Sequence, residues 1–235
     1  MRGEPHSERA RFVQGVFESI APRYDLLNRL MTAGQDRRWR RQVIRLSGLP
    51  EGGRLLDLGA GTGDLSGEAL RQHPSSHPLA ADFTPAMLRV GQPRYGDRLD
   101  WCTADALRLP FPAESFDAVV SGFLLRNVVD LPQALSEQQR VLKPGGRLVA
   151  LDTTRPHRSL LTPLIRFYMH TIIPFLGKII SGQADAYQYL SETSEGFLPA
   201  EELQAQIAAA GFGQVEFRRL MFGTIAIHWA RKQPK

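Results

Sequence analysis

The sequence predicts an α/β fold in which helices cover both faces of a mostly parallel sheet. Short apolar runs alternate with helical patterns through the middle of the chain, and a glycine-rich turn follows the first run. Near the C-terminus, two further apolar runs are separated only by residues 221–223, a turn short enough for an antiparallel hairpin. Five alternating runs and this hairpin predict a seven-stranded sheet that is parallel except at its last hairpin.

The N-terminal region reads as helices between residues 9 and 47. One helical face carries Val13, Phe17 and Ile20, and a second apolar stripe carries Trp39 and Val43. Asp36 is placed to cap the second of these helices. We expect this region to cover the substrate side of the molecule.

The middle of the chain alternates between strands and helices. Thr84 and Pro85 are typical of a helix cap and a first helical residue, and Asp130 precedes a helix that ends near Leu142. This alternation favours a doubly wound parallel sheet. The expected strands are 54–58, 79–82, 99–103, 116–121 and 146–152.

The alternation stops at Pro156 and resumes at Ala200, after an apolar and basic insert that several prolines interrupt. Charged residues divide its apolar run, so it is a poor membrane span. We expect it to be a substrate lid and membrane-facing surface; a helical cap on the core and a dimer interface are the alternatives. The pattern ends with a helix at 200–210 and strands at 215–220 and 224–231.

Length and composition favour one globular domain. The chain has 235 residues, 43% of them hydrophobic and 23% charged. The single cysteine excludes an internal disulfide, and no apolar run of secretory type opens the sequence, so we expect a cytoplasmic protein. The net charge of +5 suits nucleic acid, an anionic bilayer or a solvated face, and does not choose among them. The expected parts of the single domain 1–235 are a helical substrate cap (1–50), a cofactor-binding core (51–155), the apolar insert (156–199) and a C-terminal helix with its hairpin (200–235).

The turn after the first strand carries the most informative motif. Glycines at alternate positions, Gly59, Gly61 and Gly63, follow the acidic Asp57. A dinucleotide fingerprint would need glycine at position 64, which is Asp64, and no phosphate-binding P-loop is present. Open α/β sheets bind ligands at this carboxyl edge.

This spacing resembles motif I of class I S-adenosylmethionine-dependent methyltransferases, which have a Rossmann-like fold. The resemblance implies S-adenosylmethionine as the cofactor. Asp82 ends the second strand, where a carboxylate can accept hydrogen bonds from both ribose hydroxyls. Asp105 resembles the residue that accepts from the adenine amine. The implied cofactor residues are Asp57, Gly59, Gly61, Thr62, Gly63, Asp82, Asp105, Ala106 and Gly122.

A second resemblance concerns the substrate and covers nearly the whole chain. The segments Tyr24–Asn28, Leu125–Val128 with Asp130, Arg140–Arg147 and Ala184–Leu190 resemble signatures of the ubiquinone/menaquinone-biosynthesis C-methyltransferase family. It implies a polyprenylated quinol as the substrate, and the enzyme would work at the inner face of the membrane.

The chain departs from this family's pattern at several positions, among them Leu27, Thr32, Asp36 and 152–154, and two of the departures fall in one loop. Leu124 stands where the family has glycine, and Gly122 stands where many members have a cofactor-side serine. Two alternatives therefore stay open: a divergent paralogue that methylates another phenol or lipid, and a catalytically weak module that binds S-adenosylmethionine.

The family's reaction assigns roles to three residues. A ring carbon becomes nucleophilic when the neighbouring hydroxyl loses its proton, so a group that stabilises the phenolate is required. Arg126 is the candidate for that role and for polarising a water that takes the proton, while Asn127 and Tyr24 orient the ring. The structural alternatives are an ion pair of Arg126 with Asp130 and a packed core ring for Tyr24.

No metal and no nucleic acid are expected. His73 and His77 have helical ligand spacing, but Pro74 lies between them. The chain also lacks the Asn/Asp-Pro-Pro-Tyr motif of base methylation, and its basic residues are not interleaved with an aromatic stacking platform.

Overall fold

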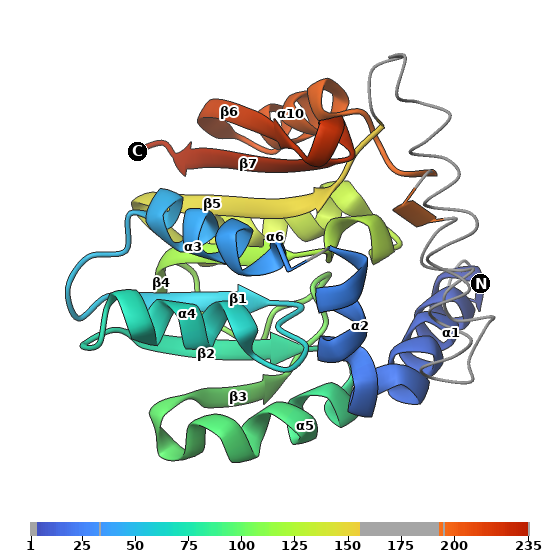
Figure 1. Ribbon diagram of the computed structural model, residues 1–235. Coiled ribbons are helices and arrows are strands. Elements are labelled where there is room, and N and C mark those ends of the chain that lie inside the picture. Colours follow the sequence, from blue (N-terminus) through green and yellow to red (C-terminus); the bar gives the residue numbers. More distant parts are fainter. Residues whose placement is uncertain (1–3, 33, 156–192, 195, 235) are drawn as a thin grey trace.

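The computed structural model describes residues 4–32, 34–155, 193–194 and 196–234. Its centre is a seven-stranded sheet with the order β3-β2-β1-β4-β5-β7-β6 (Figure 1). Strands β1 to β5 pair in parallel, while β7 runs antiparallel to both β5 and β6, which confirms the predicted architecture. The strands are β1 (Arg54–Leu58), β2 (His77–Asp82), β3 (Asp100–Thr103), β4 (Phe116–Gly122), β5 (Leu142–Thr153), β6 (Phe212–Leu220) and β7 (Ile225–Lys232).

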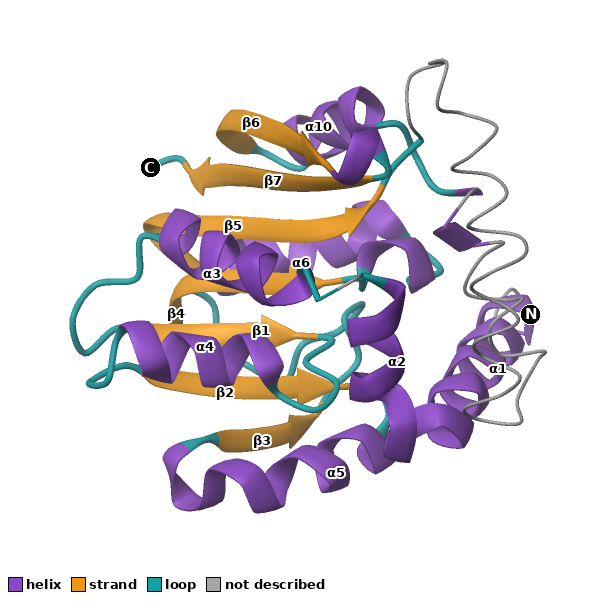
Figure 2. Ribbon diagram, viewed as in Figure 1, coloured by secondary structure: helices purple, strands orange, loops and turns teal. Residues whose placement is uncertain are grey.

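Helices cover both faces of this sheet (Figure 2). Successive side chains of a strand point to opposite faces, so Leu55 belongs to the core cluster that contains residues of α3 and α4, while Leu56 belongs to the cluster that contains residues of α6 and α10. Both leucines are fully buried, as expected for a parallel sheet covered on each side. The covering helices are α3 (Asp36–Ser47), α4 (Asp64–Gln72), α5 (Pro85–Tyr95), α6 (Leu131–Val141) and α10 (Ala200–Ala209).

An N-terminal arm crosses the carboxyl edge of the parallel strands (Figure 1). It consists of α1 (Glu4–Ile20), the short 3-10 turn η1 (Ala21–Arg23) and α2 (Tyr24–Met31). Val16 and Ile20 are buried, and α1 packs against α5. The arm therefore lies over the edge where the sequence predicts the cofactor.

The structure confirms two of the three predicted helix caps. Thr84 caps α5 with Pro85 as its first residue, and the Asp130 carboxylate accepts a hydrogen bond from the amide of Gln133 at 3.0 Å. The prediction for Asp36 is wrong, because Gln35 is the N-cap of α3. Asp36 is instead the first residue of the helix, where it is buried and pairs with Arg40 at 3.1 Å.

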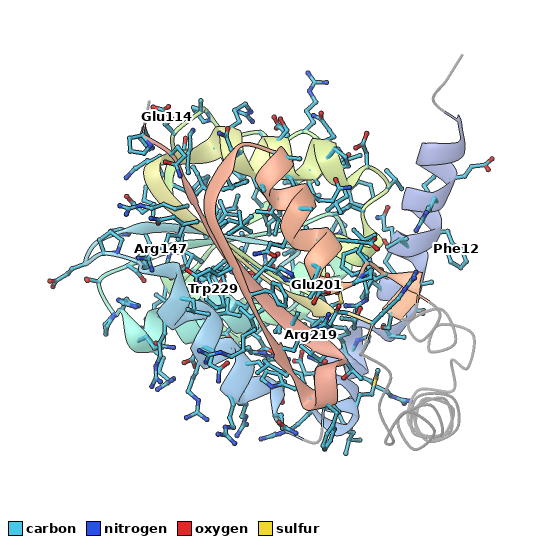
Figure 3. All side chains as sticks on the ribbon, turned by 90° about the horizontal axis from the view of Figure 1, so that it is seen from above. Phe12, Glu114, Arg147, Glu201, Arg219 and Trp229 are labelled. Carbon is cyan, nitrogen blue, oxygen red and sulfur yellow. The ribbon has the colours of Figure 1, made fainter. Side chains whose placement is uncertain are left out.

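The C-terminal hairpin extends beyond the predicted strands. β6 begins at Phe212 and contains an irregularity between Gly213 and Glu216, where the pairing with β7 shifts register. Arg219 on β6 pairs with Glu201 on α10 at 2.6 Å, which fastens the last helix to the sheet (Figure 3).

Residues 156–192 and 195 lie outside the described part of the chain, and the predictions for the insert fall almost entirely on them. Within the described part, no helix combines the length and the apolar character that crossing a bilayer requires.

Candidate active site

The turn after β1 has a left-handed backbone at each alternate glycine. The φ angles are +68° at Gly59, +58° at Gly61 and +82° at Gly63, a region that residues with a Cβ adopt at a cost. A Cβ on Gly63 would also lie 2.6 Å from the ring of Trp101. The amides of Gly59 and Ala60 both donate to the carbonyl oxygen of Ala81, at 2.8 and 3.0 Å, which ties the turn to β2. The alternate spacing therefore follows from the backbone of this turn and its packing.

Asp82, at the end of β2, holds the turn in place. Its Oδ2 accepts from the amide of Gly61 at 2.8 Å, and its Oδ1 accepts from the amide of Thr84 at 2.7 Å. Burial raises the pKa of this carboxyl, and the two amide donors oppose that rise. Each carboxylate oxygen can accept a second hydrogen bond, so Asp82 retains acceptor capacity for a ligand.

Asp57 is buried beneath the turn at the first residue of the motif. Its Oδ2 accepts from the amide and the hydroxyl of Ser66 at 2.9 and 2.8 Å, which anchors α4. Its Oδ1 is buried and has no partner among the described groups. Burial raises the pKa of Asp57 to about 7, against the lowering effect of the Ser66 hydrogen bonds.

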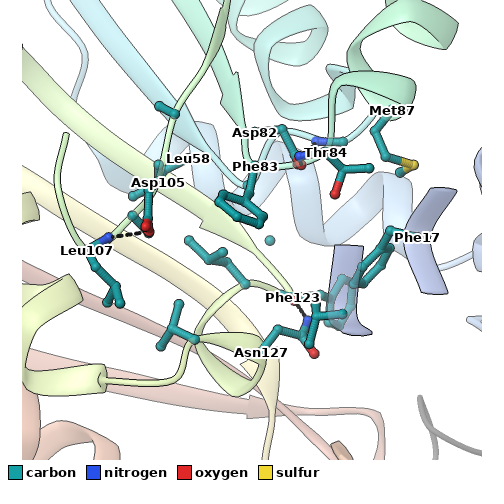
Figure 4. Close-up of a pocket in the computed structure, with 18 of the residues that line it drawn as sticks. Phe17, Leu58, Asp82, Phe83, Thr84, Met87, Asp105, Leu107, Phe123 and Asn127 are labelled. Atoms are coloured by element: carbon teal, nitrogen blue, oxygen red, sulfur yellow. Dashed lines mark hydrogen bonds between the residues drawn. The ribbon is translucent and has the colours of Figure 1, made fainter. Parts of the chain in front are cut away.

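A cavity of about 470 Å³ opens above the turn (Figure 4). Both Asp82 and Asp105 line it, and the Asp105 carboxylate accepts from the amide of Leu107 at 2.9 Å. A smaller hollow of about 40 Å³ lies next to Asp57. Residues shared by the two linings are Tyr24, Gly59, Gly61, Gly122 and Phe123.

Gly122 and Leu124, which depart from the family pattern, both line the 470 Å³ cavity, which we call the main cavity. A Cβ on Gly122 would lie 3.4 Å from Leu65, an ordinary contact, so a small side chain would fit there. A methyl carbon of Leu124, in contrast, lies 2.8 Å from the place a Cβ on Gly59 would take. The Leu124 side chain therefore packs directly on the first glycine of the turn.

Tyr24 and Asn127 reach the cavity from two separate elements. Tyr24 is the first residue of α2, and its ring meets Phe17 edge-on with centroids 6.1 Å apart. Burial raises the pKa of Tyr24 to about 12, although the positive charges of Arg126 and Arg40 oppose the rise. The phenol therefore keeps its proton at neutral pH and can donate a hydrogen bond.

Asn127 ends the 3-10 turn η3 (Leu125–Asn127). Its Nδ2 donates to the carbonyl oxygen of Phe123 at 2.9 Å, so its Oδ1 faces away from that partner. This Oδ1 is buried and unpaired among the described groups, which is unusual for a buried amide oxygen. It offers a free acceptor beside the cavity.

Arg126 does not line the main cavity. Its guanidinium donates to Oδ1 of Asp152 at 2.7 Å, with the two side chains 8% and 1% exposed. The same guanidinium lies over the ring of Phe123, 4.9 Å from its centroid. The alternative interpretation, an ion pair of Arg126 with Asp130, is wrong in its partner, because Asp152 near the end of the neighbouring strand pairs with Arg126 instead.

Arg126 instead lines a second hollow of about 520 Å³, which shares Val128 and Val129 with the main cavity. The structure thus places Arg126 behind the Phe123 ring. It brings Tyr24 and Asn127 to the same cavity as six of the predicted cofactor residues, Gly59, Gly61, Asp82, Asp105, Ala106 and Gly122. Asp57 and Thr62 line only the small hollow, and Gly63 lines neither.

Sequence reasoning missed two groups at this site. Phe83 and Phe123 form aromatic walls of the cavity, and each comes directly after the last residue of a strand at the carboxyl edge, a signal that could have found them. Asp25 on α2 accepts from the Thr62 hydroxyl at 2.6 Å and pairs with Arg94, contacts that no local pattern indicates.

The two histidines with helical spacing do not share a helix. His73 is the C-cap residue that follows α4, and His77 begins β2. Among the described residues, no group of three potential metal-binding side chains comes together.

The sheet order, the antiparallel last strand, the glycine turn after β1 and the carboxylate that ends β2 define a class I S-adenosylmethionine-dependent methyltransferase. Among solved structures, the Haemonchus contortus phosphoethanolamine N-methyltransferase 2 in complex with S-adenosyl-L-methionine has a TM-score of 0.64 at 17% identity. The match covers 84% of this chain and 53% of that one, and it shows the fold.

Residues 5–232 match the model of the ubiE/COQ5 methyltransferase family, and the chain belongs to this family. The ubiquinone/menaquinone biosynthesis C-methyltransferase UbiE of Desulfotalea psychrophila is 45% identical over 94% of this chain and 90% of its own length. The demethylmenaquinone methyltransferase of Thermus thermophilus is also 45% identical, over 91% of this chain and 98% of its own. The resemblance identified from the sequence motifs is confirmed.

Proposed function

We propose that this methyltransferase transfers a methyl group from S-adenosylmethionine to a ring carbon of a lipid quinol in the main cavity. The observation that carries the proposal is that the predicted cofactor residues and the predicted substrate residues line the same cavity. Asp82 and Asp105, on the cofactor side, face the same volume as Tyr24 and Asn127. Relatives that carry quinone-methylation names at 45% identity support the same substrate class.

The residues present fit the cofactor. Asp82 and Asp105 supply carboxylate acceptors for ribose hydroxyls and the adenine amine, and Gly61 leaves the turn open to the cavity. The unpaired Oδ1 of Asp57 suits a cationic ligand group next to the small hollow. When bound, S-adenosylmethionine supplies a methyl group activated by its sulfonium.

The quinol hydroxyl would lie between Tyr24 and Asn127. The free Oδ1 of Asn127 can accept a hydrogen bond from the quinol hydroxyl, and the protonated Tyr24 can donate a hydrogen bond to the oxygen of that same hydroxyl. These two contacts orient the ring, and orientation matters because transfer needs carbon and methyl within roughly 3 to 3.5 Å. Phe17, Phe83 and Phe123 form apolar walls that exclude water from the ring.

Arg126 acts on this ring through its charge. Its charge opposes the rise in the Tyr24 pKa, so its field reaches the phenol that faces the substrate. A positive charge held there by Asp152 would stabilise the phenolate as it forms.

The test is incubation with labelled S-adenosylmethionine and a set of reduced, demethylated benzoquinols and naphthoquinols, followed by mass measurement of the lipid product. We expect one added methyl group on at least one quinol. Cofactor binding without transfer to any quinol would indicate a binding module instead. Transfer only to phenols that lack a prenyl tail would indicate a paralogue with another substrate.

Two wider proposals follow from a lipid substrate. A long-tailed quinol resides in the bilayer, so we propose weak, salt-sensitive peripheral binding at the inner face of an anionic membrane. Pelleting with anionic liposomes at low salt, lost at high salt, is the expected result. The alternative is that the apolar insert forms a homodimer interface. Sedimentation equilibrium without lipid tests this, because a dimer would have twice the mass of the chain.

A further inference from the structure

Polar contacts hold α2 on the rest of the molecule. None of its described side chains is fully buried: Tyr24 is partly buried, and Leu26 and Leu30 are 54% and 40% exposed. Asp25 makes the principal connections, because its two carboxylate oxygens face two different elements. Oδ1 accepts from the hydroxyl of Thr62 at 2.6 Å, and Oδ2 pairs with Arg94 on α5.

Thr62, whose hydroxyl donates to Asp25, belongs to the glycine turn. Thr62 lies between Gly61 and Gly63 and is only 2% exposed, so its hydroxyl moves only with the turn. Arg94 also reaches Asp64, the first residue of α4, at 3.9 Å. Asp25 is therefore connected to the turn directly and to the helix that follows it through Arg94.

The residue before Asp25 is the one that faces the substrate. Tyr24 lines both the main cavity and the small hollow, and α2 begins with it. Beyond the ring contact of Tyr24 with Phe17, the described side chains of α2 supply little apolar anchoring, so the position of Tyr24 depends on Asp25. A ligand that holds the glycine turn in one place would thereby also fix Tyr24.

We propose that Asp25 is a positioning residue that couples cofactor binding at the glycine turn to the seating of Tyr24 against the quinol. This inference rests on the proposed function of the cavity. It implies that the bound cofactor or its product prepares the quinol site, so occupancy of the turn should slow the opening of α2.

The experiment compares the wild type with Asp25→Asn and Thr62→Val, a variant that keeps the side-chain shape and removes the hydroxyl. S-adenosylhomocysteine is the probe: calorimetry gives its dissociation constant, and hydrogen exchange reports the amides of Tyr24–Met31 with and without it. In the wild type we expect the probe to slow exchange in α2. In both variants this protection should disappear while the probe still binds.

Steady-state kinetics add the ratio of the change in KM to the change in kcat, which a general loss of stability would not alter. The quinol KM should rise about tenfold in either variant, because a hydrogen bond to a charged group is lost, while kcat at saturating quinol changes far less. Asp25→Asn also weakens the pairing with Arg94, so the double variant should be no worse than Asp25→Asn alone, where the Thr62 contact is already weakened. Glu201→Gln, which breaks a remote ion pair of similar length, is the control and should leave protection and KM unchanged.

The outcomes separate this inference from the proposed function. If the wild type binds the probe and methylates a quinol but α2 exchanges equally fast with and without it, the coupling is refuted and the function stands. Unchanged protection and KM in Thr62→Val would refute it as well, even if Asp25→Asn fails to fold. A wild type that binds no probe would overturn both.

Discussion

Replacement of Arg126 by alanine should destabilise the protein as well as slow its reaction. Asp152 is 1% exposed, and Arg126 is its only charged partner in the described structure. The carboxylate would keep two backbone donors, the amide of Thr153 at 2.8 Å and the amide of residue 126 at 3.3 Å.

The magnitude follows from the burial of this pair. Breaking a buried ion pair by removing one partner costs about 3 to 5 kcal/mol, since a charge is left without compensation. The two backbone donors that remain place Arg126→Ala at the lower end, about 3 kcal/mol. Loss of the contact between the guanidinium and the Phe123 ring adds roughly 0.5 to 1 kcal/mol.

The assay is urea unfolding at neutral pH, followed by tryptophan fluorescence. A loss of less than about 1 kcal/mol in Arg126→Ala would refute the reasoning, because it would mean that Asp152 is not held by this arginine in the folded protein. The double variant Arg126→Met with Asp152→Asn removes both charges and should recover part of the stability.

The double variant also separates structure from chemistry. If Arg126 only neutralises Asp152, the double variant should recover both the stability and the turnover that Arg126→Ala loses. If its charge stabilises the phenolate, the double variant should bind S-adenosylmethionine normally and still transfer methyl groups poorly. Turnover near the wild-type rate in a stable double variant would remove Arg126 from the mechanism.

Three further changes test the cofactor side. Asp82→Ala should weaken S-adenosylmethionine binding by about 1.5 to 3 kcal/mol, because it removes charge-assisted acceptors, and unchanged affinity in calorimetry would exclude Asp82 from the site. Asp57 has a folded pKa of about 7, above its unfolded value, so the wild type binds more protons folded than unfolded at mildly acid pH. The wild type should therefore lose stability relative to Asp57→Asn as pH rises from about 4 to 7, and a constant difference in unfolding free energy between the two proteins across that range would contradict this. Gly59→Ala should cost about 1 kcal/mol or more through its φ of +68° and its contact with Leu124. Adding Leu124→Ala should relieve only the contact, as thermal unfolding of Gly59→Ala, Leu124→Ala and the double variant would show.

The sequence by itself determined the secondary structure and the glycine turn. Strand runs, the Thr84–Pro85 helix start and the Asp130 cap depend on neighbouring residues, so their patterns can be read along the chain. The left-handed backbone at Gly59, Gly61 and Gly63 is likewise a local property. Carboxylates at strand ends could be placed at one edge, because parallel strands end on the same side.

The tertiary structure alone decided which charges pair and which side chains share the cavity. Arg126 pairs with Asp152 because β4 and β5 are neighbours and their carboxyl ends meet; sequence proximity had favoured Asp130. Asp25 meets Thr62 because the N-terminal arm returns across the sheet edge, 37 positions away along the chain. Such contacts depend on distances of a few ångströms between separately packed elements, and local periodicity carries no information about those distances.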